Sequence, residues 1–534
     1  MRMLGKRITG FLVLILVSLA ATASARVGVF TWHNDNARTG QNLTESRLTP
    51  ATVRSQTFGK LFTLPVDGQV YAQPLFVADL SIPGQGRHDV VYVATEHDSV
   101  YAFDADGRPR IPLWRASLAS RAGVTPLPSK DTGDTYLVTP EMGITGTPVI
   151  DPVTGTLYAL AATKEIHGAS VRYLQELHAL DIATGAEKFG GPVSIEAIVP
   201  GSGVGNDGHG HVPFDPLREF DREALVLSRG VVYIAFASHA DFGAYHGWVL
   251  GYDAATLKQV MVFNATPNGE QGGIWQSGAG PAADDSGDLF FVTGNGTFDA
   301  DSGGPDYGDS IVRLAPTGKV VDYFTPYNQA GLSEGDVDVG STAAILLPDQ
   351  PGAHTHLAMT ATKHSDIYLV DRDHLGGYNP RSNDQIVQFL PGALHSRLGA
   401  FASPVFFKNR VYIGAEGDVI RVFELKEGRF RRPPVMQTTN SFAYPGASMS
   451  ISAHGSQDGI LWVVERPAAK AAAVLHAYLA DDLAQELYNS REASERDRLP
   501  PAIKFAPPTI AGGKVYVVGP GGVTVFGLID RSRI

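Results

Sequence analysis

Short apolar runs separated by polar turns recur along almost the whole chain. Val90 to Gly107, VVYVATEHDSVYAFDADG, is one example, in which two runs rich in Val, Tyr and Phe flank the polar turn Glu96–Ser99. Such runs are typical of β-strands, and the turn between them predicts a hairpin. Because the same pair of strands returns many times, the repeat decides the fold rather than any single segment.

Each repeat contains three recognisable strands in a constant order. The first has small residues and Pro, the second is strongly apolar, and the third resembles VYAFDADG. The second strand recurs as VVYVAT, TLYALAAT, VVYIAFAS, LFFVTGN, HLAMTAT, RVYIGAE, ILWVVER and KVYVVGP. A looser fourth strand follows in every copy but the last. These eight units predict an all-β fold, an eight-bladed β-propeller of four-stranded blades, because a ring buries both faces of every unit.

The last repeat has only three strands before the chain ends. Lys60–Val66, KLFTLPV, is a strand with no hairpin partner before it, and we expect it to supply the missing strand and close the ring. The propeller would span 60–530, with 26–59 as a surface lead-in. Ala468–Asn489 has a helical composition, with a Leu at every fourth position from Leu475. The repeat register predicts strands there instead, and we follow the register.

Composition and the N-terminus indicate where the protein works. The chain has 534 residues, a net charge of −12 and no Cys. A basic start, the apolar run Phe11–Ala20 and small residues at 23–25 predict an export signal peptide over 1–25. We therefore expect a periplasmic or extracellular protein with no membrane anchor. The chain has no block of Lys and Arg residues, so nothing indicates a nucleic-acid partner. Without Cys, it also has no attachment site for c-type haem.

One repeat carries a recognisable motif. Ala179–Phe189, ALDIATGAEKF, contains Ala-x-Asp-x-x-Thr-Gly followed by an aromatic residue, and VYAFDADG with Leu113-Trp114 is a looser match. Both resemble the blade motif of the pyrroloquinoline quinone (PQQ) propellers, a resemblance that covers nearly all of the chain after the signal. It implies the propeller fold. The function stays open, because the same blades occur in PQQ-dependent alcohol dehydrogenases and in non-catalytic scaffolds.

The middle of the chain resembles the active-site region of those dehydrogenases. The resemblance implies that Asn295, in Thr-Gly-Asn, is a calcium ligand, and that Asp338 is the catalytic base and a further ligand. It also implies that Lys363 touches the quinone oxygens. Asp241 is the nearest match to the acidic calcium ligand if one residue is inserted. Trp275 lies near the aromatic floor under the cofactor, two residues out of step with Asn295.

The chemistry explains why such a set would be needed. A flat quinone stacks on an indole, its carboxylates require cations, and Ca²⁺ requires oxygen ligands. Oxidation of an alcohol also requires a base at the hydroxyl group. However, the dehydrogenases cover the other face of the cofactor with two adjacent cysteines, which this chain lacks.

Two functions remain open from the sequence. The first is a PQQ- and Ca²⁺-dependent dehydrogenase of a small alcohol or sugar. The second is a cofactor-free binding or scaffolding propeller for a glycan or protein ligand. Only the first requires Asp241, Asn295, Asp338 and Lys363 to converge around one pocket on the propeller axis.

Overall fold

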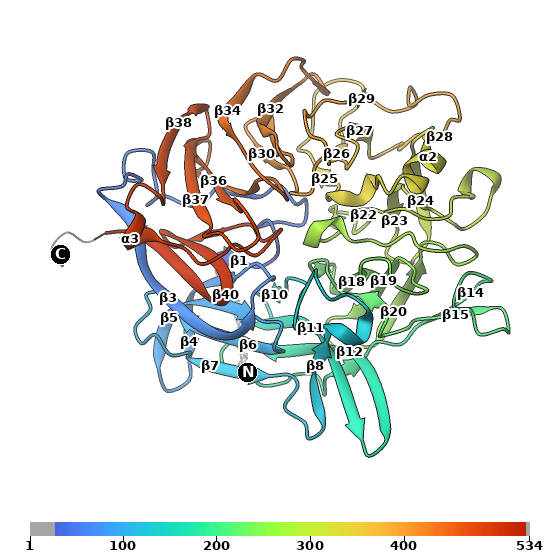
Figure 1. The fold of residues 1–534 in the computed structure, drawn as a ribbon, viewed down its shortest axis with the longest axis horizontal. Helices are drawn as coiled ribbons and strands as arrows, with labels where there is room; N and C mark the ends of the chain where they lie inside the picture. Colours follow the sequence, from blue (N-terminus) through green and yellow to red (C-terminus); the bar gives the residue numbers. More distant parts are fainter. Residues whose placement is uncertain (1–26, 530–534) are drawn as a thin grey trace, which may run out of the picture.

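The computed structural model describes residues 27–529 (Figure 1), so the predicted export signal lies outside the described residues. Strands dominate this part of the chain, and its helices are all six residues or shorter. No helix within 27–529 is long and apolar enough to cross a membrane. The helices are α1 (Ser129–Thr132), α2 (Gln329–Glu334) and α3 (Ser494–Asp497), with 3-10 turns η1 (Gln276–Gly278), η2 (Ala300–Ser302) and η3 (Val339–Ser341).

The larger sheets follow one another in chain order around a common centre (Figure 1). The first contains β1 (Gly28–Val29), β4 (Leu75–Ile82), β5 (Gly86–Ala94), β6 (Ser99–Asp104) and β7 (Trp114–Ser117). The second contains β8 (Val124–Pro128), β9 (Glu141–Met142), β10 (Val149–Asp151), β11 (Thr156–His167), β12 (Ser170–Asp181) and β13 (Val193–Ser194). A two-stranded excursion follows, β14 (Ile198–Pro200) with β15 (His211–Pro213).

The next three sheets pass through the middle of the chain. The third contains β16 (Glu219–Phe220), β17 (Val226–Ser228), β18 (Val231–Ser238), β19 (Trp248–Asp253) and β20 (Gln259–Asn264). The fourth contains β21 (Ala282–Ala283), β22 (Leu289–Val292), β23 (Ile311–Leu314), β24 (Val320–Thr325) and β28 (Gly377–Tyr378). The fifth contains β25 (Ile345–Leu346), β26 (Leu357–Ala361), β27 (Ile367–Asp371) and β29 (Gln388–Leu390).

The last three sheets complete the series. The sixth contains β30 (Val405–Phe407), β31 (Arg410–Gly414), β32 (Val419–Lys426), β33 (Arg429–Phe430) and β34 (Met436–Ser441). The seventh contains β2 (Gln41–Asn42), β35 (Ser448–His454), β36 (Gln457–Glu465), β37 (Val474–Leu479) and β38 (Asp482–Asn489). The eighth contains β3 (Phe58–Gln69), β39 (Thr509–Ala511) and β40 (Lys514–Leu528).

The predicted strands appear where the repeat placed them. β5 and β6 form the expected hairpin, with Val90 opposite Asp104. The segment with helical composition is the antiparallel pair β37 and β38. Leu475 and Leu487 lie in one apolar cluster with Trp462, whereas Leu483 lies in another cluster. Burial of both faces of this sheet therefore outweighs the helical propensity of the sequence.

The two ends of the folded chain meet in the eighth sheet. The first part of β40 pairs with β39, with Val515 opposite Ile510. Its later part pairs with β3 from the N-terminal region, with Val523 opposite Leu64. The expected pairing of Lys60–Val66 with the last strand is therefore present.

The first strand of each repeat is an inner strand of its sheet (Figure 1). Small residues in and just before these inner strands allow neighbouring sheets to approach closely. A Cβ added to Gly146 would lie 2.3 Å from the carbonyl oxygen of Glu223, and one added to Gly280 would lie 2.2 Å from that of Ala224. Larger side chains would force these sheets apart. This crowding explains the small residues of the first strand in each repeat.

The segment before β3 differs from the expected surface lead-in. Trp32, His33 and Arg38 are buried, and the rings of Trp32 and His33 stack 3.6 Å apart. Arg38 donates from Nε to the carbonyl oxygen of Pro281 over 2.9 Å and from Nη1 to Thr31 Oγ1 over 2.8 Å. Its guanidinium satisfies carbonyl oxygens of crowded inner strands, which neither polarity nor periodicity could reveal.

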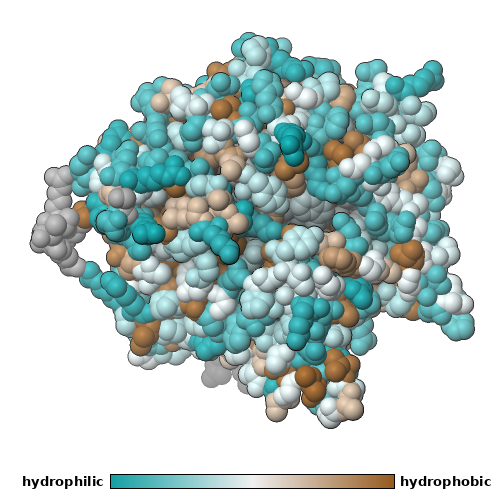
Figure 2. Space-filling model, in the orientation of Figure 1, coloured by the Kyte–Doolittle hydropathy of each residue, from teal (hydrophilic) through white to brown (hydrophobic). Residues whose placement is uncertain are grey.

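One feature projects from the disc. The long β11–β12 hairpin extends outward, and its tip exposes Ile166 and Val171 (Figure 1). The hydrophobic atoms at the lower edge of Figure 2 lie over this tip. The rest of that face mixes polar and apolar residues, so the centre of the disc is the more informative region.

Candidate functional site

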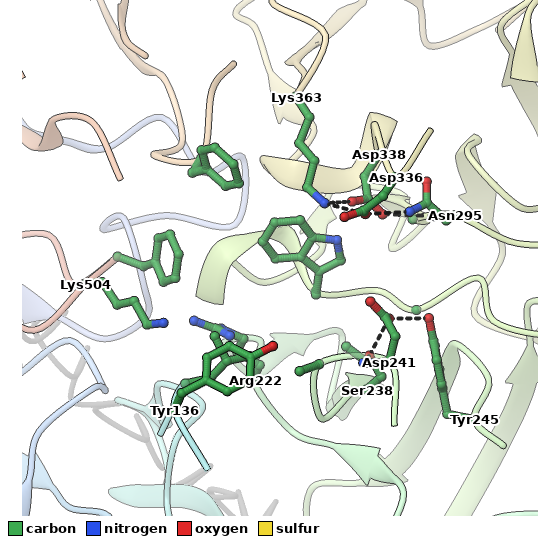
Figure 3. A pocket seen from close by; sticks show the side chains of 18 of the residues that line it. Tyr136, Arg222, Ser238, Asp241, Tyr245, Asn295, Asp336, Asp338, Lys363 and Lys504 are labelled. Atoms are coloured by element: carbon green, nitrogen blue, oxygen red, sulfur yellow. Dashed lines mark hydrogen bonds and ion pairs between the residues drawn. The ribbon is translucent and has the colours of Figure 1, made fainter. Parts of the chain in front are cut away.

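A cavity of about 260 Å³ lies among the loops of the sheets (Figure 3). All five residues predicted for a site line it, namely Asp241, Trp275, Asn295, Asp338 and Lys363. The set required by the dehydrogenase hypothesis is therefore brought together in one place.

Successive sheets supply these side chains. Asp241 lies between β18 and β19, Trp275 immediately before η1, and Asn295 follows β22. Asp338 comes directly before η3, and Lys363 lies between β26 and β27. The third, fourth and fifth sheets thus present their loops to one cavity.

An ion pair joins Lys363 and Asp338. Lys363 Nζ contacts Asp338 Oδ2 and lies 2.8 Å from Asp336 Oδ1. The side chain of Asp338 is 7% exposed, whereas that of Asp336 is 72% exposed. Burial lowers the pKa of Lys363, but the two carboxylates outweigh it and the net pKa is raised. Lys363 therefore carries a positive charge in the cavity at neutral pH.

Asn295 holds the acidic loop in place. Its backbone N–H donates to Asp338 Oδ1 over 2.9 Å, and its Nδ2 donates to Asp336 Oδ1 over 2.9 Å. A Cβ on the preceding Gly294 would lie 2.5 Å from Asp338 Oδ1, so glycine permits this approach. Among the described residues, nothing hydrogen-bonds the buried Oδ1 of Asn295. That oxygen is therefore a buried acceptor whose hydrogen-bonding capacity the described chain leaves unused.

Asp241 is fixed by neighbours in its own loop. Its Oδ1 accepts a hydrogen bond from Ser238 Oγ over 2.9 Å and from the Tyr245 hydroxyl over 2.5 Å. Burial, reinforced by the charge of Asp241, raises the pKa of Tyr245 well above its usual value. Tyr245 therefore remains a donor, and Oδ2 of Asp241 accepts no hydrogen bond within 27–529.

Trp275 begins a row of aromatic side chains. Lys363 Nζ lies 5.2 Å from the centroid of its ring, and the Phe401 ring lies 6.2 Å away. From Phe401 the row continues to Tyr444 at 5.2 Å and from there to Phe505 at 6.3 Å. Aromatic side chains thus connect the acidic end of the cavity to its other end.

That other end is basic, and the sequence motifs did not identify it. Arg222 and Lys504 line the cavity there (Figure 3). The Arg222 guanidinium lies 4.7 Å from the centre of the Phe505 ring, and Lys504 Nζ lies 5.8 Å from it. Burial lowers the pKa of Lys504 to about 7, and the charges of Arg222 and Arg466 act in the same direction.

A signal for these residues exists in the repeat. In six of the eight repeats, the residue three positions before the Pro of the first strand, or before the equivalent position, lines this cavity or a smaller one adjoining it. The aligned residues are Tyr71, Thr145, Arg222, Gly278, Phe401 and Phe505. Repeat alignment could therefore have found Arg222, although it does not predict a charge there.

The oxygen donors that line the cavity are of the types that a hard cation accepts. Asn295 Oδ1 has no partner, and Asp241 and Asp338 contribute carboxylates to the same cavity. Within the described part of the chain, no group of three His, Asp or Glu side chains lies close enough to hold a metal ion. The candidate set instead combines two carboxylates with an amide oxygen, all ligand types that Ca²⁺ accepts.

Comparisons with known proteins agree with the fold. No family model matches the chain, and no curated protein matches it in sequence. The quinohemoprotein alcohol dehydrogenase ADHIIG of Pseudomonas putida HK5 is similar in structure, with 15% identity and a TM-score of 0.61 over 94% of this chain and 80% of that one. A europium-containing methanol dehydrogenase is similar with 14% identity and a TM-score of 0.55 over 93% and 98%.

These neighbours are β-propellers. The likeness shows that this chain has a β-propeller fold similar to that of these two dehydrogenases. At such low identity the likeness shows the fold alone.

Proposed function

We propose that the protein is a PQQ- and Ca²⁺-dependent dehydrogenase that oxidises a small alcohol or sugar. One observation carries this proposal: Asp241, Trp275, Asn295, Asp338 and Lys363 come from successive sheets and line the same cavity. A structural repeat alone gives no reason for an acid, an amide oxygen, a lysine and an indole to meet there.

The finer architecture belongs to the same proposal. We infer that the eight larger sheets are the blades of one propeller that spans 60–530. In this arrangement β3 closes the ring in the last blade. Supporting this are the eight repeats in the sequence and the pairing of β3 with β40.

Each side chain has a place in holding the cofactor and metal. Asn295 Oδ1, Asp241 and Asp338 would supply oxygen ligands to Ca²⁺, and the Trp275 ring would supply a flat face for stacking. PQQ, when bound, would supply the acceptor for the hydride of the alcohol.

The chain's own residues would manage the proton. Asp338 would accept the proton of the substrate hydroxyl, which is the task of a general base. Lys363, protonated beside it, would hold a positive charge where negative charge develops. Asn295 would fix the position of Asp338 through its backbone N–H.

The setting of the reaction is also proposed. The signal over 1–25 would export the protein to the periplasm or beyond the cell. Because the chain has no Cys for c-type haem attachment, its electrons would pass to a separate molecule.

Reconstitution tests this function. The purified protein would be loaded with PQQ and Ca²⁺, and dye reduction would be followed with a panel of alcohols and aldoses. Asp338→Asn should lower turnover about a hundredfold or more, because the base is removed. Asp336→Asn, in the same loop but exposed, should have a much smaller effect. Failure of the wild-type protein to bind PQQ at all would favour the binding or scaffolding propeller instead.

A further inference from the structure

We propose that Arg222 and Lys504 form a carboxylate-binding subsite at the end of the cavity opposite Asp338. The subsite rests on the proposed function only for the choice of ligands. These are a carboxylate of PQQ or the carboxylate of an acidic alcohol.

Arg222 is a buried cation with unused hydrogen-bonding capacity. The residue is 7% exposed, and its Nη2 is buried without a hydrogen-bond partner among the described residues. No ion pair within 27–529 includes Arg222 or Lys504. A guanidinium that is removed from water and left unpaired is costly, unless an anion completes it.

The acids nearest to Arg222 do not neutralise it. Glu96 and Glu223 are both buried within reach of its charge. Burial raises the pKa of Glu96 to about 7. Burial and the neighbouring Asp221 raise the pKa of Glu223 well above its usual range. Both shifts disfavour the charged carboxylates, and neither acid forms an ion pair with Arg222 among the described residues.

Lys504 adds a second cation to the same end. Asp134 is the acid whose charge reaches Lys504. The Oδ1 of Asp134 is already committed to the backbone N–H groups of Tyr136 and Leu137, each 2.9 Å away. Its Oδ2 is buried without a partner, and no ion pair joins Asp134 and Lys504 among the described residues.

The walls suit an anion attached to a flat or apolar body. Phe505 lies beneath both cations, and Tyr136 and Tyr444 complete this end of the cavity. The row from Phe505 to Trp275 would let a ligand reach Lys363 and Asp338 while its carboxylate stays at Arg222. The two ends thus differ in charge: acids with one lysine at one end, and unpaired cations at the other.

Calorimetry on the intact protein tests the subsite with two matched ligand pairs. The first pair is PQQ and its trimethyl ester, and the second is 4-(hydroxymethyl)benzoate and benzyl alcohol. In each pair only one member carries the anionic charge. The wild-type protein should bind PQQ or the benzoate about tenfold or more tightly than the neutral partner.

Variants assign the preference to the two side chains. Lys504→Met and Arg222→Met should each remove about tenfold of the affinity for the anionic ligand and leave the neutral ligand unaffected. Lys504→Arg should restore most of the loss. Lys470→Met, an exposed lysine outside the cavity, is the matched control. Thermal unfolding of each variant confirms that it is folded.

A measurement on the wild-type protein needs no variant. Binding of an anion beside Lys504 should draw a proton onto its amine near pH 7.5. The heat of binding should then depend on the ionisation enthalpy of the buffer. If Lys504 had a merely structural role, the heat of binding would not depend on the ionisation enthalpy of the buffer.

The outcomes separate the two ligand sources and the two proposals. A preference for PQQ over its ester assigns the subsite to the cofactor, and one for the benzoate assigns it to a substrate. If the protein shows either preference but does not reduce the dye, the carboxylate subsite is supported and the dehydrogenase activity is not. Equal affinity within both pairs, or a preference that survives both Met variants, would overturn the subsite.

Discussion

The two ends of the cavity are built in different ways. At the acidic end Lys363 is paired with Asp338 and Asp336, and Asn295 binds the same carboxylates. At the basic end Arg222 and Lys504 lack such partners in the described chain. The lysine of the acidic end is paired by the protein itself, whereas the two cations of the basic end are not.

This difference indicates what each end is prepared for. A satisfied ion pair keeps catalytic groups in place before a ligand arrives. Unpaired buried cations instead reserve binding energy for an anion. The two ends of the cavity are also positioned by different sheets. The acidic end is formed by loops of the third to fifth sheets, whereas Lys504 precedes β39 in the eighth sheet, which contains strands from both ends of the folded chain.

The largest effect should follow from weakening that shared sheet. Leu64 is fully buried in β3, so Leu64→Ala should lower the free energy of unfolding by about 4 kcal/mol through lost burial and a cavity. Denaturant unfolding measures the loss. Hydrogen exchange should rise first in β39 and β40 and much less in β22 and β26. If hydrogen exchange rose equally in all of these strands, the basic end of the cavity would not depend on β3 more than the acidic end does.

Removing one lysine from each end compares them directly. Lys363→Met leaves the buried carboxylate of Asp338 without its ion-pair partner, and should lower the free energy of unfolding by about 3 kcal/mol. Lys504→Met removes a buried amine that has no counter-ion, and should leave stability unchanged or higher. Chemical denaturation of the two variants provides the test. A comparable loss in both would show that the two lysines are held alike.

The acidic end was largely predictable from the sequence, and the basic end was not. Asn295, Asp338 and Lys363 stand in segments that resemble a known site. Arg222 and Lys504 stand in no such motif. They converge because loops next to β17 in the third sheet and β39 in the eighth sheet line the same cavity. Charge at that position depends on contacts between sheets far apart in sequence.

Features of the fold that depend on local sequence pattern were also predictable, whereas those that depend on contacts between distant segments were not. Strand pattern predicted the hairpins, including β37–β38 against its helical composition, and the odd strand predicted the β3–β40 pairing. The burial of Arg38 was not predictable, because it depends on carbonyl oxygens of Pro281 and Leu225 that become available only when the inner strands meet.

The pH dependence of stability should also distinguish the two lysines. The unfolded chain keeps a proton on Lys504 to about pH 10.5, whereas the folded protein keeps it only to about pH 7. The unfolded state then binds more protons, so this side chain makes stability rise from pH 7 to about pH 9.5, by about 3 kcal/mol. Lys504→Met should flatten that rise.

Lys363 should behave oppositely in the same experiment. Its folded pKa is raised, so its stabilisation is fully present below the unfolded pKa and is lost only at higher pH. The stability difference between the wild-type protein and Lys363→Met should stay constant from pH 7 to about pH 9.5. A slope in that difference would mean that the ion pair with Asp338 does not persist in solution.

The smallest effect concerns the support of the acidic end. Tyr245→Phe removes the hydroxyl that donates to Asp241 Oδ1, and should lower the free energy of unfolding by about 1 kcal/mol. Because a hydrogen-bond donor that holds a metal ligand also orients it, the change should weaken Ca²⁺ binding by about tenfold. Tyr378→Phe, whose hydroxyl donates to a backbone oxygen away from the cavity, is the control. Calcium titration followed by Trp fluorescence measures the affinity. If Tyr245→Phe reduces stability but leaves Ca²⁺ affinity unchanged, Asp241 is a structural residue, and the oxygen ligands reduce to Asn295 and Asp338. The acidic end would then hold the ion pair without a complete metal site, and the contrast with the basic end would be one of charge alone.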